Sequence, residues 1–196
     1  SSSAYVIDGV ESPYLTLTPD TTYRFDQSDS SNATHPLRFY TAADKTGGEY
    51  TTGVTTNGTP GSSGAYTRIT VAASAPTLYY QCSAHAGMGG QVNTNSLFGS
   101  SNFSGSIQST VSVNTTAGFS IVKWTGNGSG STIGHGLDVK PKMIFVKNIS
   151  SARNWVVNIG ETIGTDERSL YLNASDAMKS DAAADHGYTY NNTTTT

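Results

Sequence analysis

The sequence predicts an all-β protein made of two β-sandwich domains. Its 196 residues are rich in Ser, Thr, Gly and Asn and lack long periodic stretches of Leu, Glu, Lys and Ala. Such a composition favours strands and turns over helices. Short segments with alternating apolar residues recur between turn signals, a spacing typical of sandwiches and barrels. The length is sufficient for two small hydrophobic cores.

We place the first domain at residues 1–95. Apolar residues alternate within its strand-like segments, as at Leu15 and Leu17, so each strand turns one face inward. Asp8 and Gly9 separate two short apolar segments and predict a tight hairpin turn. The predicted strands lie within residues 5–12, 14–18, 22–27, 36–40, 66–73 and 77–82.

The second domain is expected at residues 118–196, after a serine-rich linker or connecting strand at 96–117. Its predicted strands are 119–125, 142–148, 154–159 and 169–173. The final stretch, "SDAAADHGYTYNNTTTT", has no closing strand pattern, although the edges of a sandwich need pairing or protection. We therefore expect this second sandwich to be completed past Thr196 or by a strand from a neighbouring subunit.

Charge and hydropathy narrow the class of partner. The net charge is -3 and only 13% of residues are charged, so we expect no basic surface that could hold a phosphate backbone. Nucleic acid is therefore not expected as a partner. The run "MIFV" at 143–146 is far shorter than the roughly 20 apolar residues of a membrane-spanning helix, so no membrane span is predicted. No charged-then-apolar leader opens the chain, from which we expect a removed signal or a longer product.

The stretch "YYQCSAHAGMGGQ", at 79–91, carries the chemistry of a metal site. Cys82 is the chain's single cysteine, so it forms no intrachain disulfide. With His85 and Met88 it offers the thiolate, imidazole and weak thioether of a mononuclear copper site. The glycine-containing turn after Cys82 lets the loop curl back around one ion. A second imidazole is required, and His35 in "NATHPLRFY" lies at the start of a predicted strand.

The alternative is a site without metal. In that interpretation Cys82 is a small buried hydrophobic residue, and His85 is a turn residue left over from a copper-binding ancestor.

These residues carry a family resemblance. Residues 5–92 resemble a cupredoxin, the copper-binding Greek-key β-sandwich, and the C-x-x-H-x-x-M spacing is similar to the short ligand loop of amicyanins. The resemblance implies that His35, Cys82 and His85 are equatorial copper ligands and Met88 is the axial one. Pro36 stands where cupredoxins commonly carry an Asn that ties the ligand loops together, so we expect a less rigid tie here.

The second part of the chain carries another resemblance. Residues 118–160, with the motif "IGHGLDVKPKMIFVK", resemble a β-rich module of tail-fibre and other structural proteins of tailed phages. The resemblance implies a structural subunit of an extracellular or virion-associated fibre, without enzymatic activity, that forms a homopolymer through β-strand edges. The alternatives are a cupredoxin for electron transfer or copper binding, and an adhesin module that binds surface glycans.

Several further motifs receive structural interpretations. The glycine-rich "GNGSGSTIG" at 126–134 is followed by no predicted helix, so we interpret it as a hairpin turn rather than a phosphate-binding loop. No nucleophile or carboxylate accompanies His135 at a recognisable spacing, which favours a turn residue. Glu161, Asp166 and Glu167 lie in a loop without aromatic neighbours and are expected on a solvated surface rather than in a glycosidase site.

Sequons for N-glycosylation are frequent, and most of them fall in predicted loops. We expect glycans at some of these sites if the chain passes through a suitable secretory route. The candidate residues are Asn32, Asn57, Asn102, Asn114, Asn127, Asn148 and Asn173, and two further sequons begin at Asn191 and Asn192.

Overall fold

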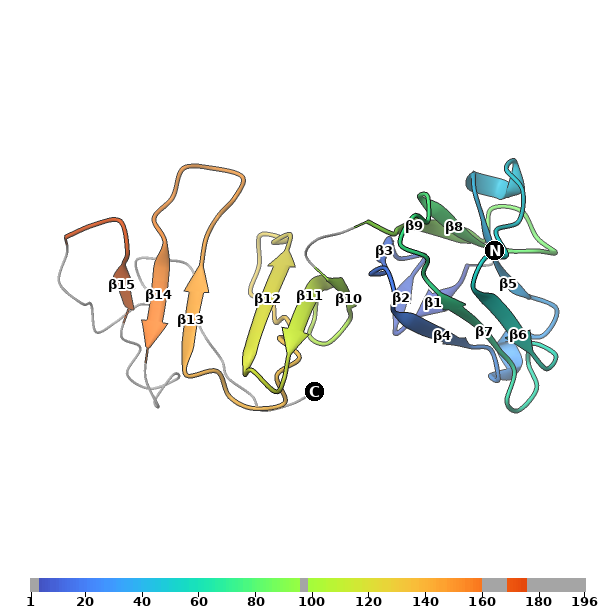
Figure 1. Cartoon of the computed structure of the whole chain (residues 1–196), viewed down its shortest axis with the longest axis horizontal. Helices are drawn as coiled ribbons and strands as arrows, with labels where there is room; N and C mark the ends of the chain where they lie inside the picture. Colours follow the sequence, from blue (N-terminus) through green and yellow to red (C-terminus); the bar gives the residue numbers. More distant parts are fainter. Residues whose placement is uncertain (1–3, 96–98, 160–168, 176–196) are drawn as a thin grey trace. The chain divides into compact units, whose positions relative to one another are not determined.

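The computed structural model describes residues 4–95, 99–159 and 169–175, and over these residues the chain is all-β (Figure 1). The predicted fold class is thereby confirmed. Contacts divide the chain into two compact units. Unit 1 comprises Ser1–Asn114 with Ser120–His135, and unit 2 comprises Thr115–Phe119 with Gly136–Thr196. This division differs from the predicted domain limits, because residues 99–114 and 120–135 belong to unit 1 rather than to a linker and to the second domain.

Two sheets form the sandwich of unit 1 (Figure 1). The first has the order β3-β9-β8-β5, with β3 parallel to β9 and the other pairs antiparallel. The second is antiparallel and has the order β4-β7-β6. The bounds are β3 Leu15–Thr16, β4 Thr22–Asp26, β5 Leu37–Tyr40, β6 Val54–Asn57, β7 Tyr66–Thr70, β8 Leu78–Cys82 and β9 Gly89–Asn93.

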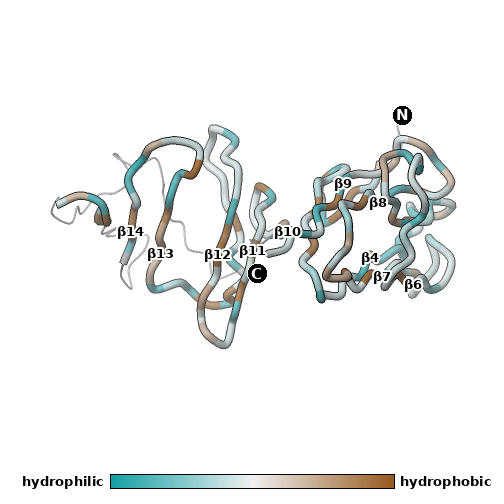
Figure 2. Tube along the Cα trace, turned by 45° about the horizontal axis from the view of Figure 1, so that its top comes forward, coloured by the Kyte–Doolittle hydropathy of each residue, from teal (hydrophilic) through white to brown (hydrophobic). Residues whose placement is uncertain are grey.

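Alternating side chains of both sheets meet in one core. Phe25 of β4 contacts Phe39 of β5 edge-to-face, with ring centroids 5.5 Å apart. Ile69 of β7 and Tyr80 of β8 belong to the same cluster and are fully buried. Figure 2 shows the corresponding alternation of hydrophobic and hydrophilic residues along the tube. Because each strand contributes every second side chain to this core, the cluster fixes which residues face inward.

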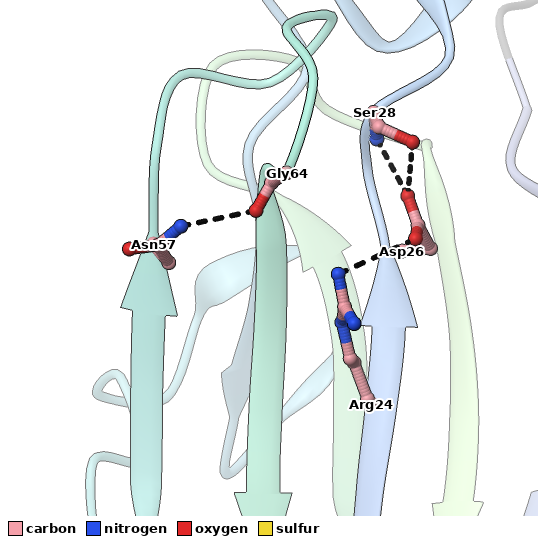
Figure 3. A network of polar contacts seen from close by, with 5 residues as sticks. All are labelled: Arg24, Asp26, Ser28, Asn57 and Gly64. Atoms are coloured by element: carbon pink, nitrogen blue, oxygen red, sulfur yellow. Dashed lines mark hydrogen bonds and ion pairs between the residues drawn. The ribbon is translucent and has the colours of Figure 1, made fainter.

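The opposite face of the β4-β7-β6 sheet is polar and exposed (Figure 3). Arg24 lies over the Tyr66 ring, 4.6 Å from its centroid, and pairs with Asp26 at 3.5 Å. Ser28 donates hydrogen bonds from its hydroxyl and its backbone to the Asp26 carboxylate, and these lower the pKa of Asp26. A polar outer face and an apolar inner face confirm the predicted alternation in this strand.

The short elements of unit 1 close its turns. Strands β1 (Val6–Ile7) and β2 (Val10–Glu11) form the predicted hairpin, in which Asp8 and Gly9 both have positive φ, 46° and 84°. This backbone geometry matches the right-handed twist of the two strands. Two 3-10 turns, η1 (Ser30–Asn32) and η2 (Ala43–Lys45), lie on either side of β5.

A third sheet, β10-β11-β12, follows the sandwich in sequence. Its strands are Ser100–Asn102, Ser109–Asn114 and Phe119–Trp124. Hydrogen bonds join it to the end of β3, because the Thr16 amide donates to the Ser101 hydroxyl at 2.7 Å. The stretch predicted as a linker or a single strand thus contains two paired strands. The glycine-rich loop after β12 does not form a simple hairpin, since Ile133 bridges Gly105 instead.

Unit 2 contains the antiparallel sheet β13-β14-β15. Its strands, Met143–Val146, Val156–Ile159 and Ser169–Tyr171, coincide with the predicted segments. The C-terminal stretch from residue 176 lies outside the described residues, as does the expectation that it lacks a closing strand. Within the residues described, no helix has the length and apolar character needed to cross a bilayer.

Candidate metal centre

The structure brings His35, Cys82 and His85 together at one end of the sandwich. Cys82 is the last residue of β8 and pairs with Leu37, the first residue of β5, so His35 lies just before the strand beside it. The Cys82 Sγ lies 3.8 Å from the His35 Nδ1 and 3.4 Å from the His85 Nδ1. Cys82 is fully buried, His35 is half-buried and His85 is exposed.

These distances suit ligands of one metal ion. A transition metal lies about 2.3 Å from a thiolate sulfur and about 2.0–2.1 Å from an imidazole nitrogen. Ligand atoms around a tetrahedral or trigonal ion are then separated by about 3.5–3.8 Å. The three ligand atoms of this cluster lie within 4.8 Å of one another. The two sulfur–nitrogen distances therefore suit a mononuclear site.

Met88 is buried next to this cluster. It is only 5% exposed, and it belongs to the same core cluster as Cys82. Its carbonyl accepts a hydrogen bond from the Cys82 amide at 2.8 Å, which closes the ligand loop at its base. All four predicted ligand residues therefore lie in one region, three of them with their donor atoms clustered.

A buried glutamine positions His35. Gln27 is 2% exposed, and its Nε2 donates to the His35 carbonyl at 2.9 Å. Its Oε1 accepts from the Leu37 amide at 3.1 Å and from the Thr67 hydroxyl at 3.3 Å. Because Gln27 follows β4 while Leu37 begins β5, this single side chain joins the two sheets immediately behind the candidate ligand.

Tyr5 provides a second hydrogen-bond donor to the His35 carbonyl, from within the core. Its hydroxyl donates to the same His35 carbonyl at 2.8 Å. Burial of the ring, and then the neighbouring Cys82 sulfur, raise the pKa of Tyr5 far above its usual range. Tyr5 consequently stays protonated and remains a hydrogen-bond donor at any physiological pH.

The ligand loop is also tied directly to the chain around His35. The Ser83 amide donates to the Pro36 carbonyl at 2.9 Å, which continues the β5–β8 ladder beyond the strands. Within the loop, the Gln81 Nε2 donates to the His85 carbonyl at 2.8 Å. A main-chain hydrogen bond thus ties the two loops together at Pro36, where a less rigid tie was expected.

Sequence reasoning missed these supporting residues. Tyr5 is the first residue of the predicted strand segment 5–12, and Gln27 is the last residue of the segment 22–27. The polar partners of both lie far along the chain or across the sandwich, so no local motif distinguishes them. Asp44 and Lys45 of η2, which contact the ligand loop, were likewise missed.

The other candidates remain separate from this site. His135 lies in a loop, where its carbonyl accepts a hydrogen bond from the Ser120 hydroxyl at 2.6 Å. Glu161, Asp166 and Glu167 lie outside the described residues, as do Asn191 and Asn192. Binding of surface glycans remains a prediction.

The sequon asparagines differ in exposure. Asn57, Asn114, Asn127 and Asn173 are exposed, whereas Asn32, Asn102 and Asn148 are half-buried. In two cases the amide nitrogen to which a glycan would be linked donates to a backbone carbonyl: Asn57 to Gly64 at 3.0 Å (Figure 3) and Asn102 to Gly134 at 3.1 Å. Glycosylation of the sequons remains a prediction, and at these two residues it would replace one of the two N–H groups of the donating amide nitrogen.

Fold and site together define an all-β protein with a His-Cys-His cluster at the end of a sandwich. A family model described as a domain of unknown function, DUF7483, matches residues 93–196, and the chain belongs to that family. No curated protein and no solved structure matches the chain. The family match begins at the last residue of β9, so His35, Cys82 and His85 precede the matched region.

The role of Gln27 can be tested by replacement with Leu, which has a similar size. The Q27L variant leaves the Leu37 amide without its partner, and we expect a loss of about 1–3 kcal/mol in the free energy of unfolding. Urea denaturation measures this loss, and the Leu37 amide should exchange its hydrogen faster in the variant than in wild type. The exposed Gln91→Leu should change stability by less than about 0.5 kcal/mol. Equal stability of the two variants would contradict the assignment.

Proposed function

We propose that unit 1 binds a single copper ion through His35, Cys82 and His85, with Met88 as a further, weaker ligand. The observation that carries this proposal is the approach of both imidazole Nδ1 atoms to the Cys82 sulfur, at 3.8 and 3.4 Å. Hydrogen bonds to the backbone at His35 and His85 support both ligand segments.

The donor set favours copper over other ions. A thiolate with two imidazoles suits soft or borderline transition metals, whereas magnesium and calcium prefer oxygen ligands. Zinc accepts the same three ligands, but a buried thioether beside them is typical of copper electron-transfer sites. The resemblance of residues 5–92 to cupredoxins points in the same direction. Bound copper would supply one-electron redox chemistry.

Exposure of the ligands supports electron transfer as the role. Cys82 and Met88 are buried, and only His85 among the four is exposed. The ion would therefore be shielded from solvent on its sulfur side, and electrons would reach it through the exposed imidazole edge of His85. Three strong protein ligands and a thioether leave no evident position for a substrate, in contrast to catalytic metal sites. We therefore assign unit 1 no enzymatic activity.

Titration with Cu(II) under anaerobic conditions tests this function. The chain should bind one equivalent and develop an intense thiolate-to-copper charge-transfer band in the visible region. Cys82→Ala should abolish the band, and His85→Ala should weaken binding at least about tenfold. His135→Ala, which removes a histidine outside the cluster, should behave as wild type.

Circular dichroism of each variant establishes that it is folded. Binding without a thiolate band, or equal binding by C82A, would contradict the copper assignment, and a preference for zinc over copper would point to a structural zinc site.

A second function, self-assembly into an extracellular or virion-associated fibre, is supported by exposed apolar strand edges. Strand β12 is an edge strand of its sheet, and its Phe119 and Ile121 are 62% and 46% exposed. Strand β13 is an edge strand in unit 2, with Met143 and Phe145 47% and 52% exposed. Open edges with apolar side chains favour pairing with another chain. The resemblance of residues 118–160 to phage fibre modules suggests further copies of this chain as partners.

Sedimentation velocity and negative-stain electron microscopy test assembly. Wild-type protein should form higher oligomers or filaments as its concentration rises, and Ile121→Lys should shift the distribution toward monomer because it places a charge on the pairing edge. Val139→Lys provides a matched control, since Val139 is 62% exposed but lies in a loop. A monomer at all concentrations would exclude self-assembly.

A further inference from the structure

The turn η2 is unusual because it holds two consecutive residues in left-handed backbone conformation. Asp44 has φ 49° and ψ 32°, and Lys45 has φ 63°. Such conformations are unfavourable for residues with a Cβ atom, and they are maintained where surrounding contacts require them. Thr46 closes the turn through its backbone and its hydroxyl, which both donate to the Ala43 carbonyl, at 3.1 and 2.7 Å.

Both residues use their side chains to hold the backbone of the ligand loop. The Asp44 Oδ1 accepts a hydrogen bond from the Gly87 amide at 3.0 Å. The Lys45 Nζ donates to the Ser83 carbonyl at 3.0 Å. Ser83 lies two residues before His85, and Gly87 lies two residues after it. The turn therefore forms hydrogen bonds with the loop backbone on both sides of His85, the exposed candidate ligand.

These two hydrogen bonds support the part of the candidate site that does not pack in the hydrophobic core. Residues 83–87 are all exposed, whereas Cys82 and Met88 on either side of them are buried. From strand β8, the Gln81 side chain donates to the His85 carbonyl. The His85 ring contacts the His35 ring, with centroids 4.5 Å apart, but the loop that carries it is exposed. The Ser83 amide ties this loop to Pro36, and the two charge-assisted hydrogen bonds from η2 anchor it on both sides of His85.

We propose that Asp44 and Lys45 are positioning residues of the metal centre, which hold the ligand loop so that the His85 Nδ1 faces the Cys82 sulfur before metal arrives. This inference rests on the proposed copper site and concerns its supporting shell. Because the loop is already ordered in the metal-free chain, metal binding does not have to supply the conformational entropy lost in ordering it. Outer-shell partners of metal ligands typically change affinity by 10–100-fold when they are removed.

Because Asp44 and Lys45 carry opposite charges, their replacement distinguishes a positioning role from a purely electrostatic effect on metal affinity. If only charge mattered, loss of the Asp44 carboxylate would weaken binding of a cation, and loss of the Lys45 ammonium would strengthen it. Positioning predicts that both losses weaken binding. Lys45→Met, which keeps much of the side-chain length without the donor, therefore gives opposite results under the two explanations.

The experiment compares Cu(II) affinity, by competition with a chelator, in wild type, Lys45→Met, Asp44→Gly and Asp44→Asn. Glycine removes the carboxylate but accepts the left-handed conformation, so the turn persists. We expect K45M and D44G to bind about 10–100-fold more weakly than wild type, and D44N, which retains an oxygen acceptor, to recover most of the loss. Asp20→Gly is the matched control, because Asp20 is exposed at φ 58° outside the site.

A second readout uses the metal-free chain. Hydrogen exchange at the Gly87 amide should accelerate in D44G and remain near the wild-type rate in D44N and in D20G. Tighter copper binding by K45M, or wild-type affinity and Gly87 exchange in D44G, would overturn the positioning role while leaving the copper site intact. A wild-type chain that binds no copper would overturn the proposed function itself, and the role of the turn at a metal site with it.

Discussion

The register between β5 and β8 is the constraint on which the candidate site depends. It places Leu37 opposite Cys82, and the ladder continues outward through the hydrogen bond from Ser83 to Pro36. A slip of one residue would turn Cys82 out of the core and move His35 away from it. Leu37, Phe39 and Tyr80 are buried on these same strands, so the hydrophobic core enforces the register that assembles the ligands.

The ligands are supported in ways that match their exposure. Cys82 is fixed by the core itself, and the His35 backbone is fixed by Gln27 and Tyr5, which reach it from inside the sandwich. His85 lies in an exposed loop, where the Gln81 side chain donates one hydrogen bond to its carbonyl. The turn η2 supplies contacts there, and the strain of its two left-handed residues is offset by the hydrogen bonds that they make to the loop backbone.

Strand positions and candidate ligands could be predicted because their signals are local. Alternation along the segments at 22–27 and 77–82, and the spacing of Cys82, His85 and Met88, need no knowledge of the fold. Strands β6 and β9 were missed because "VTTN" and "GGQVN" lack such alternation. In β9 a Cβ at Gly90 would overlap the Tyr80 ring, so packing against β8 dictates a residue that strand propensity disfavours. The supporting contacts of Gln27 and Asp44 arise only in the folded chain.

The family match covers residues 93–196, whereas the candidate ligands all precede it, so the copper assignment depends on unit 1 alone. X-ray absorption at the copper edge of the loaded, full-length chain tests that assignment most directly. One short sulfur scatterer with two imidazole nitrogens would match the Cys82, His35 and His85 cluster. A shell of nitrogen and oxygen atoms without sulfur would contradict it, because the buried thiolate would then take no part in binding.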